Sequence, residues 1–366
     1  MKVECLKEKL EIAIGYAEKI TSKNSTLPVL KCVYLEASKN QLIIKATNLD
    51  LGIEVVIPVK VDREGVVAVP GSVLYTFLSN IKNEKNITIE EVEGNLKVST
   101  SRHSTVIKCF PTEEFPIIPH IEGEKKIIIS AKDLVKGFKS VWYSASISSM
   151  KPELSSVYVY SDEEGLVFAA TDAFRLAEKK VPLKKKLDFS SILIPFKNVA
   201  EIVKILDGKS DDIELRIDKH QLSFTIGDIY LTSRIIDGVF PDYHNLIPKA
   251  SQTEVIILKQ DLVDGLKVAN VFSDKFNKVT LNIAPSKKIF ELRTKNNDIG
   301  ESLNNLAGSL TGESVEISFN YKNITDAFQA LEADSIVLGF NGLNKPLSMR
   351  GVSDKTFVYI VMPMNK

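Results

Sequence analysis

The strongest constraint on this fold is a pattern of apolar residues that occurs three times along the 366-residue chain. Apolar positions at i, i+4 and i+7 or i+8 predict amphipathic helices at 5–20, 133–146 and 261–274. Their leading leucines, Leu6, Leu134 and Leu262, are 128 residues apart in both intervals (134 − 6 and 262 − 134). Because a chain of this length exceeds what one hydrophobic core organises, the spacing predicts repeated domains.

A second set of predicted helices keeps a similar interval. The segments 69–81, 194–206 and 319–331 each place a strand-like apolar residue before a helical pattern. These leading residues are Val69, Ile194 and Phe319, which are 125 residues apart in both intervals (194 − 69 and 319 − 194). Two independent landmarks in the same order indicate a repeat of whole domains.

Two more landmarks lie between and after the helices. The stretches ATNLDLGIE, ATDAFRLAE and RTKNNDIGE align at Thr47, Thr171 and Thr294. Phe-Pro or Met-Pro pairs at 115–116, 240–241 and 362–363 then close the three units. The predicted domains are 1–121, 127–247 and 254–366, separated by the short polar connectors 122–126 and 248–253.

The fold class follows from what each unit contains. Alternating runs such as NLKVST, IELRI and QLSFTI predict strands, and each unit adds two helices. We therefore expect an α+β fold of three tandem similar domains, in which two helices cover one face of a sheet.

Charge and cysteine content limit which classes of partner and which cellular compartment the sequence suggests. Lys plus Arg and Asp plus Glu both number 47, so no net field draws the whole protein to polyanions. The three cysteines, Cys5, Cys32 and Cys109, form no C-x-x-C pair and are interpreted as reduced core thiols. The charged start of the chain lacks the apolar region of a signal peptide, so we expect a cytoplasmic protein.

Basic residues concentrate on the outward faces of some predicted helices. In the segment 131–145, Leu134 and Phe138 fall on one side, while Lys132, Lys136, Lys139 and Tyr143 fall on the other. Further outward lysines are Lys197, Lys204 and Lys267. Such a stripe suits weak, sequence-independent phosphate contact, although an ordinary solvated helix face has the same appearance.

No motif for catalysis or metal binding occurs. The sequence lacks a phosphate-binding G-x-x-x-x-G-K-[ST] loop, H-E-x-x-H and G-x-S-x-G, and its four histidines have no metal-ligand spacing. We therefore expect no catalytic residue, no metal and no cofactor, with a nucleic-acid hydrolase using Asp172 and His244 as the alternative. As structural residues, Asp172 is expected to form a turn and Arg175 an ion pair or a carbonyl cap.

Several segments together resemble one family. ATDAFRLA, FPDYHNLIP, LPVLKCVYLEA, FNYKNITDAFQAL and the terminal YIVMPMN are similar to signatures of the bacterial DNA polymerase III beta subunit, the replication sliding clamp. The resemblance runs along the whole chain in the family's order.

The resemblance implies a DNA clamp, a head-to-tail homodimer whose six similar domains form a ring around double-stranded DNA. The helices would line the hole, and the ring would tether the replicative polymerase without base contacts. The implied partners also include a clamp loader and repair proteins, which bind through short linear peptide motifs, and the clamp itself would catalyse nothing. A multi-domain DNA-binding protein that forms no ring is the other alternative.

The resemblance also implies a peptide pocket between the second and third domains. Its positions in the second domain are Leu154, Thr171, Ala173, Phe174, Arg175, Leu176, Pro241, Asn245 and Leu246. Its positions in the third domain are Phe276, Asn320, Asn323, Val361, Met362, Pro363 and Met364. Apolar walls with a few polar groups suit a reversible peptide site, although Met362 and Met364 also fit the core of a C-terminal strand.

Other implied positions concern DNA and the ring closure. Asn24 stands where some members of the family have a DNA-facing arginine, so the neighbouring Lys23 is the candidate. Ile107, Val271 and Phe272 match interface positions of the homodimer. The chain departs from the family at Ala173-Phe174 and at its ending, Asn365-Lys366.

Overall fold

The computed structural model describes residues 1–22, 26–122, 126–183 and 191–364. The chain forms two compact units, Met1–Lys132 with Ala200–Ile235 and Asp133–Val199 with Ile236–Lys366. The predicted domain at 127–247 contributes strands to both units. The boundaries of the two compact units therefore differ from those of the three sequence repeats.

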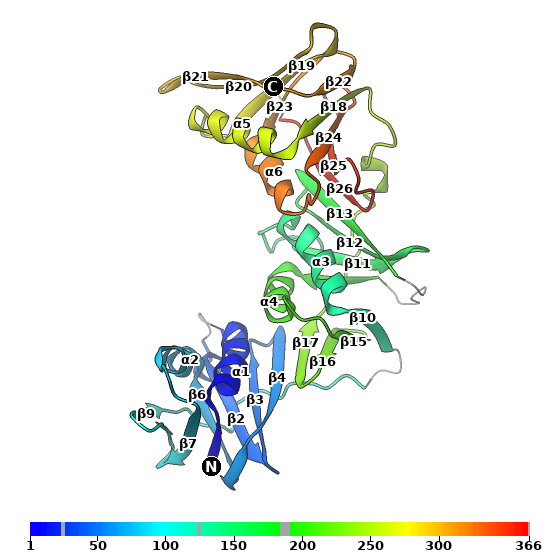
Figure 1. The fold of residues 1–366 in the computed structure, drawn as a ribbon. Helices are drawn as coiled ribbons and strands as arrows, with labels where there is room; N and C mark the ends of the chain where they lie inside the picture. The colour runs from blue at the N-terminus through cyan, green and yellow to red at the C-terminus, as the bar shows by residue number, and fades with distance from the viewer. Residues whose placement is uncertain (23–25, 123–125, 184–190, 365–366) are drawn as a thin grey trace. The chain divides into compact units, whose positions relative to one another are not determined.

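Two antiparallel sheets build the first unit (Figure 1). The strands of its eight-stranded sheet are, in spatial order, β10 (Lys126–Ser130), β15 (Asp212–Ile217), β16 (Gln221–Ile226), β17 (Ile229–Arg234), β4 (Leu51–Pro58), β3 (Gln41–Thr47), β2 (Cys32–Ser38) and β6 (Gly65–Pro70). Those of its five-stranded sheet are β5 (Lys60–Arg63), β1 (Lys2–Leu6), β7 (Asn86–Val92), β8 (Asn95–Ser99) and β9 (Ser104–Lys108). The antiparallel pairing of β4 with β17 joins the first and second repeats, and we call it the first junction.

Helices α1 (Lys7–Ile20) and α2 (Gly71–Asn80) pack side by side in this unit (Figure 1). Helix α1 buries one apolar stripe that includes Leu10, Ile14 and Ala17. Gly15 lets the Tyr75 ring approach, since a Cβ at this position would lie 2.9 Å from that ring. A short 3₁₀ helix at Pro28–Lys31 precedes β2.

The second unit also contains two antiparallel sheets. The strands of its nine-stranded sheet are, in order, β14 (Ile192–Pro195), β11 (Ser156–Ser161), β12 (Gly165–Thr171), β13 (Arg175–Pro182), β26 (Phe357–Val361), β25 (Leu347–Gly351), β24 (Ser335–Phe340), β18 (Thr253–Leu258) and β22 (Ser309–Gly312). Those of its four-stranded sheet are β21 (Gly300–Asn305), β20 (Ile289–Asn296), β19 (Lys278–Ala284) and β23 (Val315–Asn320). The pairing of β13 with β26 joins the second and third repeats, and we call it the second junction.

The remaining helices belong to the second and third repeats. They are α3 (Ala131–Val141), α4 (Phe196–Leu206), α5 (Lys259–Val271) and α6 (Tyr321–Thr325), with 3₁₀ helices at Trp142–Ser144, His244–Leu246, Pro285–Lys287 and Asp326–Gln329. Gly137 of α3 and Gly265 of α5 occupy equivalent positions, and a Cβ at either would lie under 3.0 Å from a side chain, Phe168 or Leu306. The second and third repeats therefore both have glycine at a position where a larger side chain would collide with a packed neighbour.

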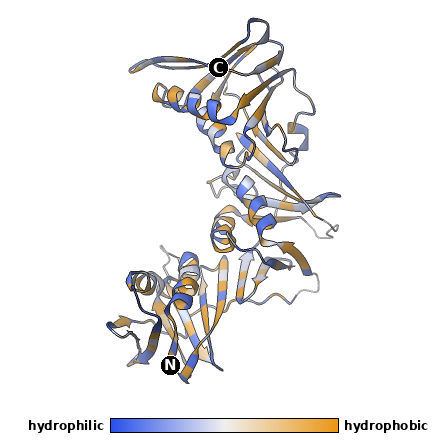
Figure 2. Ribbon diagram, viewed as in Figure 1, coloured by the Kyte–Doolittle hydropathy of each residue, from blue (hydrophilic) through white to orange (hydrophobic). Residues whose placement is uncertain are grey.

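Side-chain alternation explains the sheets. Along β19, Val279, Leu281 and Ile283 are buried, while the residues between them face outward. Figure 2 shows the resulting alternation of hydrophobic and hydrophilic residues along many strands. The spacing of apolar residues, which differs between strands and helices, thus predicts which face of each element is buried.

The predicted α+β class and all six predicted helices are confirmed, with different ends. Leu6, predicted to lead the first helix, instead ends strand β1 and is exposed, so its place in the repeat is wrong. The helix predicted at 133–146 is wrong at its C-terminus, because α3 ends at Val141 and a 3₁₀ turn follows. That change of period moves Tyr143 off the lysine face, and its hydroxyl is buried. Within the described residues, no helix is long and apolar enough to cross a membrane.

Candidate functional site

The second junction begins with a tight turn at residues 171–175, which we call the second junction turn. The Asp172 carboxylate accepts hydrogen bonds from the backbone N–H groups of Phe174 (2.9 Å) and Arg175 (3.0 Å). Thr171 Oγ1 donates to the Arg175 carbonyl at 2.7 Å and accepts from Ala173 N–H at 3.1 Å. The expected turn-forming role of Asp172 is confirmed, because its side chain replaces backbone partners that a strand end lacks.

Arg175 is a nearly buried hub rather than an open pocket wall, since its side chain is only 11% exposed. Its guanidinium donates to Asp172 Oδ2 at 3.1 Å, to the Tyr143 carbonyl at 2.9 Å and to the Asp326 carboxylate. The expected ion pair and carbonyl cap are thus both present. Burial alone would lower the pKa of Arg175, but Tyr359, Asp172 and Asp326 raise it, so the side chain stays charged.

Three expected pocket positions lie in the interior. Leu176 is 2% exposed and packs in a core cluster with Ala169, Leu193, Phe240, Tyr243 and Ile360. Thr171 and Val361 are also buried. The second junction turn and the β13–β26 pairing thus enclose Thr171, Arg175 and Leu176, and their contact with a peptide stays a prediction.

Other expected pocket positions are accessible. Phe174, Leu246 and Phe276 are 66%, 47% and 59% exposed. Ala173, Pro241 and Asn245 are also exposed, and Leu154, Met362, Pro363 and Met364 are half-buried. The Met362 N–H donates to the Phe174 carbonyl at 2.8 Å, which brings the second junction turn against the C-terminal segment. Pro241 and Leu246 flank Phe240 and Tyr243 of the same core cluster.

Asn320, Asn323 and Phe276 are held by a separate set of contacts. Asn320 caps α6 by accepting from Lys322 N–H at 3.0 Å, and it pairs with Lys278 across strands β23 and β19. The Asn323 carbonyl accepts a 2.7 Å hydrogen bond from the Tyr359 hydroxyl on β26. Phe276 lies in a turn organised by the Asp274 carboxylate, at the entrance to β19.

The buried phenols at this junction are fixed and neutral. Burial raises the pKa of Tyr143, Tyr243 and Tyr359 well above the ordinary value. Tyr243 donates to the buried Glu178 carboxylate at 2.5 Å and lies 3.1 Å from the Tyr160 hydroxyl. These phenols therefore stay protonated at neutral pH.

Asp172 and His244 belong to different networks. Asp172 is engaged by Arg175 and by two backbone N–H groups. His244 lies 3.2 Å from Asp242 and 3.1 Å from the Tyr160 hydroxyl. No hydrogen bond or ion pair among the described residues joins the two side chains, so the geometry does not support them as an acid–base pair.

The three cysteines carry the other reactive groups considered. Burial raises the pKa of Cys5 and Cys32 to about 12 and that of Cys109 to about 11, which disfavours the thiolates. Across the described part of the chain, no cluster of three His, Cys, Asp or Glu side chains could hold a metal ion.

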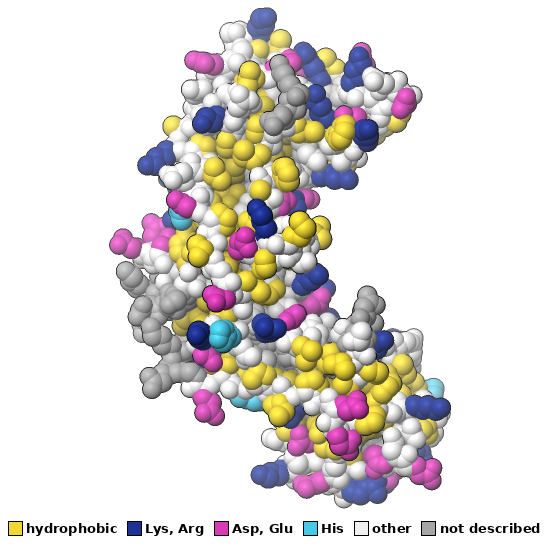
Figure 3. Space-filling model, turned by 180° about the vertical axis from the view of Figure 1, so that it is seen from behind, with side chains coloured by type: hydrophobic (Ala, Val, Ile, Leu, Met, Phe, Trp, Pro, Cys, Tyr) yellow, Lys and Arg dark blue, Asp and Glu magenta, His cyan; other side chains and the backbone are white. Residues whose placement is uncertain are grey.

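The expected DNA-facing lysines differ in their partners. Lys136 pairs with Glu332 (2.8 Å), Lys204 with Glu201 (2.8 Å) and Lys267 with Asp264 (3.0 Å). Lys132, Lys139 and Lys197 are exposed. Figure 3 shows acidic and basic side chains interspersed over one face, which fits the zero net charge. Lys23 and Asn24 lie outside the described residues, as do Asn365 and Lys366.

The expected dimer-interface residues lie on or beside edge strands. Strand β9 ends the five-stranded sheet, and β21 ends the four-stranded sheet. Ile107 on β9 is buried, whereas its neighbour Val106 is 60% exposed. Val271 is 63% exposed, and Phe272 lies close to Gly300 at the start of β21.

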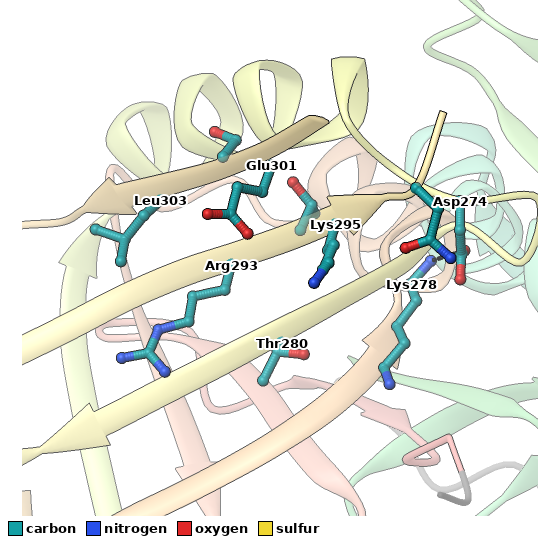
Figure 4. Close-up of a pocket in the computed structure, with 10 residues that line it drawn as sticks. Asp274, Lys278, Thr280, Arg293, Lys295, Glu301 and Leu303 are labelled. Atoms are coloured by element: carbon teal, nitrogen blue, oxygen red, sulfur yellow. Dashed lines mark hydrogen bonds between the residues drawn. The ribbon is translucent and has the colours of Figure 1, made fainter. Parts of the chain in front are cut away.

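A cavity of about 560 Å³ lies on the open face of the four-stranded sheet (Figure 4). Thr280, Arg293 and Leu303 form one cross-strand row from β19, β20 and β21, with Lys278, Lys295 and Glu301 in the neighbouring row. Arg293 is paired with Glu291 and Glu316. A neighbouring cavity of about 810 Å³ shares Lys278 and Thr280 and reaches Met364.

Sequence reasoning missed Tyr143 and Asp326 as members of the site. Both hold Arg175, yet they lie 32 and 151 residues from it along the chain. The only signal was the expectation that Arg175 forms an ion pair or caps a carbonyl. The partners themselves depend on the tertiary structure.

Comparisons with known proteins agree along the whole chain. Residues 1–119, 128–242 and 244–365 match the N-terminal, central and C-terminal domains of the DNA polymerase III beta subunit. The beta sliding clamp of Synechococcus elongatus is 26% identical over 371 residues, covering 100% of this chain and 99% of that protein.

Solved structures agree with this match. The DNA polymerase III beta subunit of Thermotoga maritima is 25% identical, with a TM-score of 0.94 over 100% of this chain and 99% of that chain. The DNA polymerase sliding clamp of Bacillus subtilis is also 25% identical, with a TM-score of 0.93 and the same coverage. Three tandem domains of this type thus account for the fold.

Proposed function

We propose how this chain, which belongs to the bacterial DNA polymerase III beta subunit family and serves as a sliding clamp, closes around DNA and holds its partners. Two copies associate head to tail, and the three domains of each, 1–121, 127–247 and 254–366, form half of a ring. A closed ring keeps a bound polymerase near its template without base contacts.

The observation that carries the ring proposal is a repeated edge-to-edge join. At the first junction β4 pairs with β17, and at the second junction β13 pairs with β26. In the alignment of the repeats, β4 and β13 correspond to β21, while β17 and β26 correspond to β9. A third join of the same kind therefore needs β21 of one copy and β9 of another.

Both strands of the proposed third join suit pairing. They are edge strands, and exposed edges of this kind are usually covered or paired. Val106 on β9 and Leu303 on β21 are both more than half exposed. Repeating a heterologous contact closes a ring when the rotation per subunit permits it, and two copies give six domains.

We place double-stranded DNA against the helices through lysines, without sequence readout. Lys132, Lys139 and Lys197 are exposed candidates for this contact. Lys136, Lys204 and Lys267 would first exchange an acidic partner for a phosphate. A few exchangeable contacts favour sliding over tight static binding.

The partner site is the accessible surface at the second junction. Phe174, Leu246 and Met362 supply apolar contact, and Pro241, Asn245 and Met364 lie at its margin. Methionine adapts to different apolar side chains, which suits one pocket shared by a polymerase, a clamp loader and repair proteins. Arg175 and Leu176 support this surface from below rather than forming its face.

We further propose that the chain catalyses nothing itself and works in the cytoplasm, on the nucleoid. Its role is then that of an accessory subunit whose chemistry is supplied by the polymerase it tethers. The neutral buried phenols and thiols at the described sites, such as Tyr243 and Cys32, fit this assignment.

The deciding experiment compares retention on nicked circular DNA with retention on the same DNA after linearisation. A topological clamp, placed on the circle by a loader, remains on it and slides off the linear form. Equal retention on both forms, lost steeply with salt, would instead indicate an ordinary DNA-binding protein.

A further inference from the structure

We infer that the first junction carries a second peptide-binding pocket, built like the second junction, that takes short uncharged apolar peptides of other proteins. The inference rests on the proposed peptide site at the second junction, because it extends that role to an equivalent position. The pocket lies wholly within the first compact unit.

The turn before β4 has the same internal geometry as the second junction turn; we call residues 47–51 the first junction turn. The Asn48 side chain accepts from the N–H groups of Asp50 (3.0 Å) and Leu51 (2.8 Å), as Asp172 does for Phe174 and Arg175. Thr47 Oγ1 donates to the Leu51 carbonyl at 3.0 Å and accepts from Leu49 N–H at 3.0 Å.

The contact that closes each junction is also the same. Arg234 N–H donates to the Asp50 carbonyl at 2.8 Å, and Met362 N–H donates to the Phe174 carbonyl at 2.8 Å. Asp50 and Arg234 therefore stand where the second junction has Phe174 and Met362. The two junctions therefore have the same backbone hydrogen bonds but different side chains at equivalent positions.

Leu49 gives the first sign that this frame serves a ligand. Its φ of +77° is in the left-handed region that a leucine rarely adopts, yet its side chain is 53% exposed. The equivalent Ala173 has φ of +75°. Because the Leu49 side chain is half exposed, its burial in the core does not explain the strained backbone. Backbone strain of this kind concentrates at functional sites.

The cavity beside Leu49 has the size and walls of a ligand pocket. It measures about 390 Å³, and its apolar lining includes Ile117, Ile118 and Leu51. Ile117 is 93% exposed, while Ile118 is buried against Gly52, where a Cβ would lie 3.1 Å from it. Tyr230 fixes this segment by donating to the Pro119 carbonyl at 3.1 Å and accepting from Ile121 N–H at 3.0 Å.

A buried hydroxyl supplies the second independent sign. Thr232 lines the same cavity and is 5% exposed, and its Oγ1 has no hydrogen-bond partner among the described residues. Buried polar atoms are nearly always satisfied, because leaving one unpaired costs stability. A peptide N–H or C=O entering the cavity would provide the missing partner.

The charges of the lining select the kind of ligand. Asp50 and Arg234 are its charged residues, and they pair at 3.4 Å on the rim, so the lining has no net charge. A polyanion gains little at such a neutral site, whereas an uncharged apolar peptide matches it. The amide of Gln221 and the rim pair offer both donors and acceptors to a peptide backbone.

The test is a titration of the full-length protein, with ¹³C-labelled Ile and Leu methyl groups, by the peptide acetyl-Gly-Leu-Leu-Gly-amide. We expect saturable shifts of the methyl signals of Leu49, Ile117 and Ile118. Acetyl-Gly-Ser-Ser-Gly-amide is the control peptide and should leave them unmoved. Unmoved signals with the leucine peptide, or equal shifts with both peptides, would overturn the inference.

Two variants separate binding from folding. Leu49→Gly should weaken the peptide about tenfold, because it removes one apolar side chain from the contact, without lowering the thermal midpoint, since glycine adopts positive φ freely. Thr232→Val should also weaken binding while preserving the fold, because it removes the unpaired hydroxyl. Unchanged affinity in both variants would refute the pocket.

The failure of this inference is distinguishable from a failure of the proposed function. The same titration reads the second junction separately, through the methyl groups of Leu154 and Leu246. Retention on circular DNA tests the clamp without reference to the first junction. Shifts at Leu246 with none at Leu49 would therefore leave the clamp proposal intact.

Discussion

The backbone N–H of Met362 lies 2.8 Å from the carbonyl oxygen of Phe174, although the two residues are far apart in the sequence. This bond continues the β13–β26 pairing beyond its last pair, Arg175 with Val361. It holds the backbone of an exposed aromatic residue beside the C-terminal segment. The partner surface therefore depends on how the second and third repeats join.

Phe174→Ala should weaken the binding of partner peptides while leaving the fold unchanged, because Phe174 is 66% exposed. We expect a loss of about 1–2 kcal/mol in binding free energy, the range for a partly desolvated aromatic contact. Fluorescence anisotropy with a labelled polymerase-derived peptide measures it. Val239→Ala, which removes another highly exposed apolar side chain, is the control. An unchanged affinity in Phe174→Ala would remove this residue from the site.

Leu176→Ala should act differently, through stability. Leu176 is packed in the core cluster, so truncation is expected to lower the free energy of unfolding by about 2–5 kcal/mol. Urea denaturation gives this value. A Leu176→Ala protein of normal stability that fails to bind peptide would instead place Leu176 at the binding surface, against the burial described above.

Arg175→Met should destabilise the second junction by about 2–4 kcal/mol, because it leaves the Tyr143 carbonyl and two carboxylates without their guanidinium partner. The measurement is again the free energy of unfolding in urea. Arg350→Met is the matched control, since the Arg350 side chain is 45% exposed and lies 3.7 Å from the Glu254 carboxylate. Equal effects of the two substitutions would contradict the hub role of Arg175.

The Lys179–Asp354 pair should make stability depend on pH in the acid range. Burial alone would raise the pKa of Asp354, but hydrogen bonds from Lys179 (2.9 Å) and Thr356 (2.8 Å) outweigh it and lower the pKa. A depressed folded-state pKa stabilises the protein above the unfolded value, about 3.9, and this contribution is lost as pH falls through the folded value.

Asp354→Asn should therefore remove part of that pH dependence. We expect the variant to be less stable than the parent at pH 6 and the difference to shrink by pH 3. Thermal unfolding across this range tests the expectation. A stability difference that stays constant from pH 6 to pH 3 would show that the Asp354 charge does not contribute.

Val106→Lys should prevent association of two copies, because it places a charge at the middle of the exposed edge strand β9. Native mass measurement should then give one chain, 40.7 kDa, instead of two. Val92→Lys, at the end of the inner strand β7, is the control and should remain a dimer. A dimeric Val106→Lys protein would exclude β9 from the interface.

The sequence by itself determined the repeat, and with it most of the secondary structure. Helical and strand periods are local properties, so the presence of α1, α3 and α5 follows from the sequence. The register of the first helix does not, because Leu6 ends strand β1 and the buried Leu10 takes the position of Leu134 and Leu262. Turn chemistry is local as well, which is why Asp172 could be assigned to a turn before its neighbours in space were known.

Only the tertiary structure decided which of the candidate site residues face solvent. Phe174 and Leu176 are two positions apart in one stretch of sequence, yet one is exposed and the other lies in the core. The difference arises because β13 pairs with β26, and because Asp326 and Tyr143 hold Arg175 from distant parts of the chain. Such contacts depend on how the repeats join, which no local pattern of residues encodes.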